Sequence, residues 1–223
     1  MEIKYLKSLK EYKYLIMFDL ASKITGVCVF DLSRNCPLFT KVIKITSKEE
    51  PFVHELYNLI GSFFCELYEQ HGIKLEDCVV SKEMPPSQAG RFTTIQTFMA
   101  LAKSHAVLDL YCAERNVDVY DYVGVAPITA HCYFKKIMGL DSKSKVEKTD
   151  IRKYVSELYN ISNLTLDESD AVFLAKTLID LKWNNDLDEK IKELKRHKKG
   201  LKLSAAISKV DKEIEELQKY RRE

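Results

Sequence analysis

The chain has 223 residues, of which 46% are hydrophobic and 30% charged, and its formal net charge is +2. That length can bury a full core, and the composition is that of an ordinary soluble globular protein. No apolar stretch approaches the roughly 20 residues needed to cross a bilayer, and the N-terminus lacks the apolar region of a secretory signal, so neither a membrane protein nor a secreted one is expected.

Three stretches rich in Ile, Val, Phe and Leu come first along the chain. Residues 13–21 and 24–32 predict two strands joined by a tight hairpin connection, and residues 37–45 predict a third. Residues 52–70 then show the apolar spacing of a helix, and Gly72 stands where a helix C-terminus favours glycine.

Strands and helices alternate in the following part of the chain. A short strand at 77–83 ends before two prolines, which prevent its continuation. The elements expected after it are a helix at 92–114, a strand at 117–123, a helix opening at Pro127, and helices at 149–159 and 168–183. Hairpin strands followed by this alternation predict an α/β fold with five strands.

The C-terminal part of the chain differs in charge. Residues 181–223 carry 13 Lys or Arg and nine Asp or Glu, whereas residues 1–180 carry 22 and 24. The end of the chain also has apolar residues at heptad-like steps of three and four, namely Ile207, Val210, Ile214 and Leu217. We therefore expect a domain over 1–183 and a basic, helical extension over 184–223, with any polyanion contact made by local patches.

The cysteines are scattered and form no CxxC pair. Several lie within apolar runs, which is typical of reduced core thiols and indicates an intracellular protein without disulfides or a zinc site. The six are Cys28, Cys36, Cys65, Cys78, Cys112 and Cys132.

Four acidic residues are the strongest functional signal. Asp19 lies inside one apolar run and Glu83 ends another, although an acid in a buried strand is costly without a partner or a cation. Asp167 and Asp170 are spaced i, i+3 at a predicted helix start, so both can face one point. Carboxylates that converge repel one another, and two Mg²⁺ or Mn²⁺ ions, which clamp a scissile phosphate, relieve that repulsion. The pattern predicts a divalent-metal enzyme acting on phosphates.

Each acid also has a structural interpretation. Asp167 alone reads as a helix N-cap, with Asp170 as a favourable charge at the helix dipole. Glu83 alone reads as the end of a strand beside a turn. Asp19 is harder to explain in this way because apolar residues flank it on both sides.

The segments that carry these acids resemble those of one family. Residues 18–27, the triplet ending at Glu83, and the D-x-x-D-A motif that starts at Asp167 are similar to the motifs of RuvC-type Holliday junction resolvases, of the RNase H/integrase superfamily. The likeness spans about residues 14–183, and the length and tail resemble phage-encoded members.

This resemblance implies a fold, an activity and a site. The fold would be an RNase H-like mixed five-stranded sheet flanked by helices, with a C-terminal helical extension. The activity would be metal-dependent cleavage of four-way DNA junctions by a homodimer in which the helix over 92–114 is the dimer element. Asp19, Glu83, Asp167 and Asp170 would ligate Mg²⁺, with Mn²⁺ as an alternative and two ions per site.

A catalytic lysine of the family matches Lys148, whose ammonium would stabilise charge developing on the phosphate; a solvated surface lysine is the alternative. The family's other lysine falls at His131, which leaves Lys135 and Lys136 as substitutes. The aromatic that wedges into the junction in bacterial members is absent after Glu83, and Phe92 is the nearest aromatic.

Two basic stretches are candidate DNA contacts, although a basic run is often only a solvated face. Their residues are Lys143, Lys145, Arg152 and Lys153 in one, and Lys195, Arg196, Lys198 and Lys199 in the other. A non-catalytic module that binds branched DNA, and an RNase H-type nuclease acting on RNA–DNA hybrids, remain as alternatives. The expected location is the cytoplasm, that of a host cell if a phage encodes the chain.

Overall fold

The computed structural model describes residues 12–46, 52–85, 94–120, 124–183, 191–198 and 204–218. Among these, Tyr12 to Ala175 form one compact unit, and the described residues from Lys176 onward belong to a second. Within the described parts of the chain, no helix is long and apolar enough to cross a membrane.

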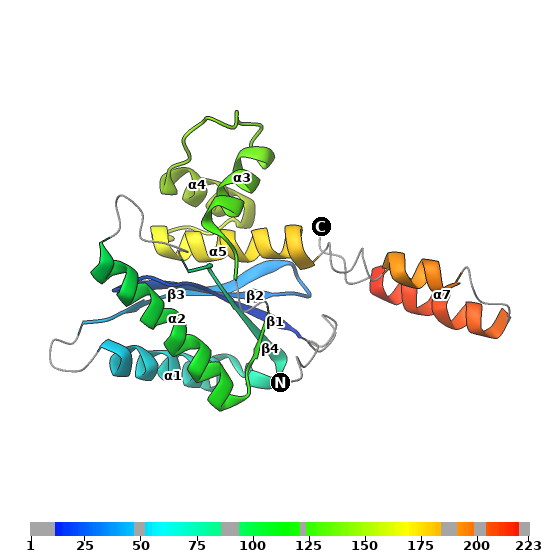
Figure 1. Ribbon diagram of the computed structural model, residues 1–223, viewed down its shortest axis with the longest axis horizontal. Coiled ribbons are helices and arrows are strands. Elements are labelled where there is room, and N and C mark those ends of the chain that lie inside the picture. Colours follow the sequence, from blue (N-terminus) through cyan, green and yellow to red (C-terminus); the bar gives the residue numbers. More distant parts are fainter. Residues whose placement is uncertain are drawn as a thin grey trace. The chain divides into compact units, whose positions relative to one another are not determined.

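One mixed sheet of five strands, in the order β3-β2-β1-β4-β5, forms the centre of the first unit (Figure 1). β1 pairs antiparallel with β2 and parallel with β4, while β2–β3 is antiparallel and β4–β5 parallel. The strands are β1 (Tyr14–Asp19), β2 (Ile24–Asp31), β3 (Cys36–Lys44), β4 (Cys78–Lys82) and β5 (Asp118–Val119). The predicted α/β fold with a mixed five-stranded sheet is confirmed.

The alternation of side chains along β1 separates the two faces of the sheet. Ile16 and Phe18 belong to the main apolar core, together with Val80 of β4 and residues of the two long helices. Because successive residues of a strand point to opposite faces, Met17 and Asp19 lie on the other face. Asp19 therefore faces away from the main core, although it continues a buried strand.

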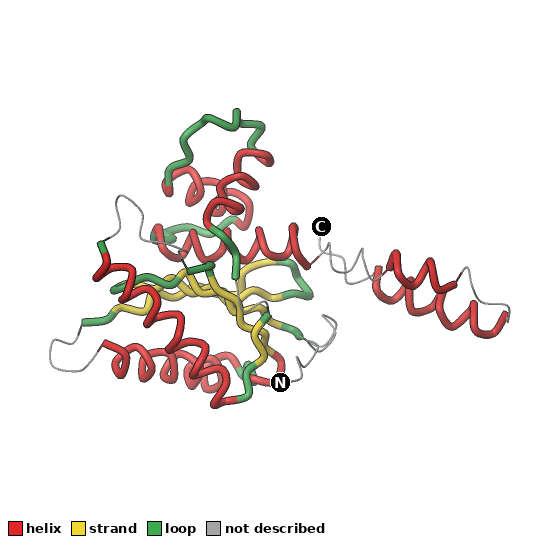
Figure 2. Tube along the Cα trace, viewed as in Figure 1, coloured by secondary structure: helices red, strands yellow, loops and turns green. Residues whose placement is uncertain are grey.

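Helices cover both faces of this sheet. α1 (Phe52–His71) and α2 (Ile95–Arg115) pack on one face, and α5 (Leu166–Leu178) begins on the other (Figure 1). α3 (Pro127–Ile137) and α4 (Lys148–Tyr159) form a helical pair joined by a loop (Figure 2). Phe134 of α3, Tyr154 of α4 and Phe173 of α5 meet edge to face and hold this pair on α5.

The predicted elements are present, with differences at their ends. β5 has only two residues where 117–123 was predicted, and 121–123 lie outside the described residues. α5 starts at Leu166 instead of residue 168 and becomes a π-helical segment, Ile179–Trp183, beyond Leu178. All six cysteines are free thiols, but Cys65 and Cys132 are exposed, so the interpretation as core thiols does not hold for these two.

The described part of the second unit is helical. Residues 191–198 form one helix and α7 (Ser204–Gln218) another, with Val210, Ile214 and Leu217 buried. The Lys198 ammonium lies 2.6 and 2.7 Å from the two Asp211 carboxylate oxygens and joins the two helices.

Candidate active site

Two of the four acids stand at adjacent strand ends. Asp19 is the last residue of β1, and Glu83 directly follows β4, the parallel neighbour of β1. Because the carboxyl ends of parallel strands meet at one edge, their side chains reach the same place. The Glu83 carboxyl donates a hydrogen bond to the Asp19 carboxylate.

The backbone at Glu83 is held from both sides. Its amide donates to the Phe18 carbonyl at 2.9 Å, and Glu83 forms an isolated parallel bridge with Val125. The approach of this second segment requires Gly124, which has a φ of +82° and would place a Cβ 2.3 Å from the Lys82 carbonyl oxygen. The backbone of Glu83 is therefore held by two neighbouring segments, which a residue that merely ends a strand beside a turn does not require.

The start of α5 presents the other two acids. Thr165 and Glu168 form a reciprocal capping box, in which the Glu168 amide donates to Thr165 Oγ1 at 3.2 Å and the Thr165 amide donates to Glu168 Oε2 at 2.9 Å. Thr165 rather than Asp167 therefore caps the helix, and the structural interpretation of Asp167 as the N-cap is wrong. The Thr40 hydroxyl of β3 donates to Glu168 Oε1 at 2.9 Å and ties this helix start to the sheet.

Close approach of β2 to α5 brings these acids to the strand ends. Gly26, the partner of Asp19 in the β1–β2 register, lies so near α5 that an added Cβ would sit 2.0 Å from the Asp167 carbonyl oxygen. No residue other than glycine fits that contact without backbone movement.

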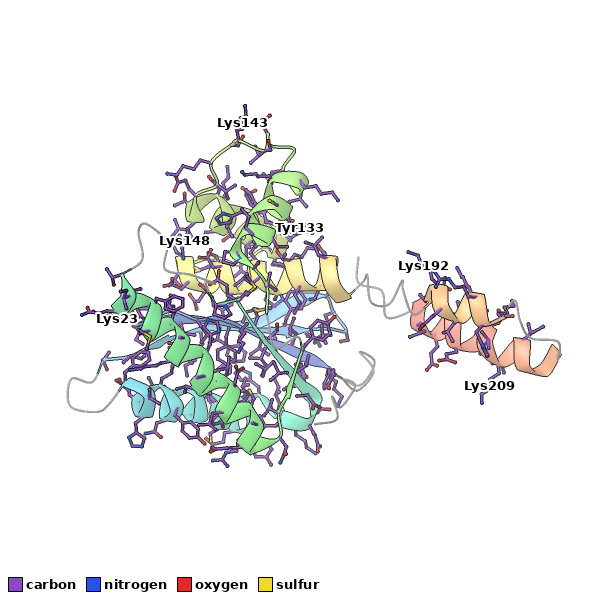
Figure 3. All side chains as sticks on the ribbon, viewed as in Figure 1. Lys23, Tyr133, Lys143, Lys148, Lys192 and Lys209 are labelled. Atoms are coloured by element: carbon purple, nitrogen blue, oxygen red, sulfur yellow. The ribbon has the colours of Figure 1, made fainter. Side chains whose placement is uncertain are left out.

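Lys148 completes the group from the first residue of α4 (Figure 3). Its ammonium lies 2.5 Å from Asp170 Oδ2 and 3.8 Å from Asp167 Oδ1. A capping box of Glu147 and Asp150 holds the start of α4. The lysine therefore faces the carboxylates, although 56% of its side chain stays exposed, so the alternative of a merely solvated surface lysine is not supported.

A cavity of about 270 Å³ opens at this point. Its polar lining comes from the sheet, α3, α4 and α5, and its apolar lining comes from the same three helices. The lining residues are Asp19, Glu83, Pro127, Ala130, His131, Lys148, Ile151, Asp170, Phe173 and Leu174.

Burial and mutual repulsion raise the pKa values of the acids in the cavity. Burial, the Asp19 charge and the hydrogen bond to Asp19 raise the pKa of Glu83 to about 8, so Glu83 carries a proton at neutral pH. Burial and the Asp170 charge raise the pKa of Asp19 to about 6, although Lys148 opposes the rise. Burial also raises the pKa of Asp170, against the hydrogen bond from Lys148.

The donor set fits a hard divalent cation. Oxygen atoms are the ligands that Mg²⁺ and Mn²⁺ prefer, and Asp170 Oδ1 is buried with no hydrogen-bond partner in the described chain. Across the described residues, no three His, Cys, Asp or Glu side chains already surround one point as a ligand shell.

Other predicted residues lie at various distances from the cavity. His131 lines it, whereas the Lys135 ammonium donates to the Ser142 carbonyl at 2.6 Å near the end of α3. Lys143 lies at the tip of the α3–α4 loop, well away from Lys148 (Figure 3). Lys136 stands in the last turn of α3 and does not line the cavity.

The remaining basic candidates have different surroundings. Lys145 pairs with Glu147 at 2.5 Å, and Arg152 and Lys153 are exposed on α4. Lys195 and Arg196 are exposed in the second unit, whose Lys198 pairs with Asp211. Phe92 and Lys199 lie outside the described residues.

Sequence reasoning missed a buried ion pair next to Glu83. Lys82 is 2% exposed, and its ammonium pairs with Asp109 of α2. His105 lies beside this pair, where burial, and then the Lys82 charge, lower its pKa to about 4. A lysine within an apolar strand was the available signal, because such a residue is buried only with a partner.

Comparisons with known proteins extend this description. No family model matches the chain, and no curated protein matches its sequence. Among solved structures, RuvC from Thermus thermophilus in complex with a Holliday junction substrate is similar at a TM-score of 0.50 and 14% identity, covering 74% of this chain and 91% of RuvC. The yeast mitochondrial Holliday junction resolvase Ydc2 is similar at a TM-score of 0.50 and 15% identity, and the match covers 75% of this chain and 77% of Ydc2. The chain thus has the fold of RuvC-type resolvases.

Proposed function

We propose that the protein is a metal-dependent endonuclease that resolves Holliday junctions, and related branched DNA, by paired symmetric nicks. The observation that carries the proposal is the convergence of Asp19, Glu83 and Asp170 from three elements on one cavity that Lys148 also lines. The fold, shared with resolvases at low identity, supports it.

The acids are proposed to hold divalent ions, Mg²⁺ or Mn²⁺, two per site. When bound, such ions activate water and stabilise the leaving oxygen of a phosphodiester. Asp19, Glu83 and Asp170 supply oxygens from the cavity wall, and Asp167 stands one residue into α5, within reach of Lys148. Lys148 is proposed to donate to the phosphate oxygen on which negative charge develops.

The surface around the cavity offers contacts for phosphates. Arg152 and Lys153 follow Lys148 on α4, whereas Lys143, at the tip of the α3–α4 loop, would contact phosphates farther from the cavity. Because Lys145 and Lys198 are already paired with acids, we expect smaller contributions from them. Neutralised phosphates release counterions, so junction affinity should fall steeply with salt.

A homodimer is proposed on the exposed face of α2. Ile95, Met99 and Leu110 are 76%, 50% and 51% exposed, and the exposed Ala102 and Ala106 lie between them. These residues are spaced by three and four, so they form one apolar stripe. Small residues between larger ends would let the α2 helices of two copies approach closely, placing two sites on one junction.

The test is incubation with a labelled synthetic four-way junction in Mg²⁺, Mn²⁺ or EDTA, with duplex, fork and RNA–DNA hybrid controls. The expected result is metal-dependent, symmetric nicking that yields ligatable duplexes. Asp19→Asn and Asp170→Asn should abolish cleavage while junction binding persists. Cleavage retained by both variants would refute the assignment of the site.

Two alternatives have their own outcomes in this experiment. Junction binding without cleavage in either metal would indicate a non-catalytic module that binds branched DNA. Cleavage confined to the hybrid would indicate an RNase H-type nuclease. The cytoplasmic location stays a prediction.

A further inference from the structure

The Lys148 ammonium interacts with all four acidic residues of the site. It contacts Asp170 at 2.5 Å and Asp167 at 3.8 Å, and its charge also acts on Asp19 and Glu83. One cation that interacts with four carboxyl groups has the electrostatic role of a bound metal ion.

The exposure of the Lys148 side chain would let its ammonium move away from the carboxylates. The capping box fixes the backbone at the start of α4, so the position of the ammonium depends on side-chain torsions and not on the helix. More than half of the side chain is exposed, whereas 15% of the Asp170 side chain is. The lysine can therefore leave the carboxylates without disturbing buried structure, but Asp170 cannot follow it.

We propose that Lys148 is an internal counter-cation that competes with divalent ions for Asp167 and Asp170. In the metal-free protein it screens the carboxylates from one another and keeps the site assembled. When a divalent ion binds, Lys148 releases Asp170 Oδ2, and its ammonium becomes available to a phosphate. This inference rests on the proposed function, because it assigns a role to the same site.

Two consequences have opposite signs and distinguish this role from that of an ordinary structural ion pair. Removing the ammonium should destabilise the metal-free protein, because uncompensated carboxylates repel one another. The same change should tighten metal binding, since no charge-assisted hydrogen bond then has to be broken and no positive charge opposes the ion.

The experiment is calorimetric titration of Mg²⁺ and Mn²⁺ into the full chain and into Lys148→Met, with thermal unfolding in EDTA. We expect Lys148→Met to bind the ions on the order of tenfold more tightly than the parent and to unfold at a lower temperature without metal. Lys148→Arg keeps the charge and should retain the parental affinity. Lys145→Met removes a lysine that pairs with Glu147 and should change neither quantity.

The outcomes separate this inference from the proposed function. If Lys148→Met binds the ions equally or more weakly while the parent binds them, the counter-cation role is wrong and the metal site stands. If the parent binds no divalent ion at all, the proposed metal dependence fails, and the inference fails with it.

Discussion

Gly26→Ala tests the geometry on which the candidate site depends. An added Cβ would lie 2.0 Å from the Asp167 carbonyl oxygen and 2.5 Å from its carbonyl carbon. Both are backbone atoms, so no side-chain rotation relieves the overlap. Reaching a tolerable separation of about 3 Å requires the start of α5, or β2, to move by about 1 Å.

That movement has two expected consequences. Overpacking of this size should lower the free energy of unfolding by about 1–3 kcal/mol. Because Asp167 and Asp170 move with α5, cleavage of a four-way junction should slow on the order of 100-fold, the usual cost of a 1 Å misplacement. Single-turnover cleavage rates and urea denaturation measure the two effects separately.

Gly61→Ala is the matched control. A Cβ there would lie 3.5 Å from Tyr111 Cε2, an ordinary contact between α1 and α2. Alanine should stabilise this helix position by about 0.5–1 kcal/mol and leave cleavage unchanged. A Gly26→Ala variant that cleaves at the parental rate would contradict the reasoning, since it would mean that the approach of α5 to β2 does not set the site.

Three further predictions concern stability and assembly. In the folded state the pKa of Asp19 is raised to about 6 and that of Glu83 to about 8. The folded state therefore binds more protons than the unfolded state. The metal-free protein should lose stability as the pH rises from about 5 to 8. Thermal unfolding in EDTA measures this loss, and stability that increases over the same range would refute it. Asp109→Ala leaves the Lys82 ammonium buried and unpaired and should cost about 2–3 kcal/mol in urea denaturation, whereas Lys82→Met combined with Asp109→Leu should recover most of that loss. Met99→Glu should convert a dimer to a monomer in light scattering, and a parent chain that is itself monomeric would disprove the α2 interface.

Much of the fold and part of the site follow from local patterns. Strand and helix periods depend on residues close together in the chain, so the order of elements and the position of Glu83 at a strand end were predictable. Asp19 was predicted inside a strand over 13–21, but it is the last residue of β1. The T-x-x-E pattern of Thr165 and Glu168 was equally local, and it would have indicated that Asp167 is not the cap.

Other features depend on contacts between distant segments. Lys143, Lys145 and Lys148 all lie in one charged stretch, and nothing local distinguishes them. Only the packing of α4 on α5 decides that Lys148 pairs with Asp170. The need for glycine at position 26 arises from the Asp167 carbonyl, which belongs to the opposite end of the domain sequence. Local sequence thus determined the order of the elements and the strand end at Glu83. The tertiary structure alone decided which of them meet, because only packing brings together groups so far apart in the chain.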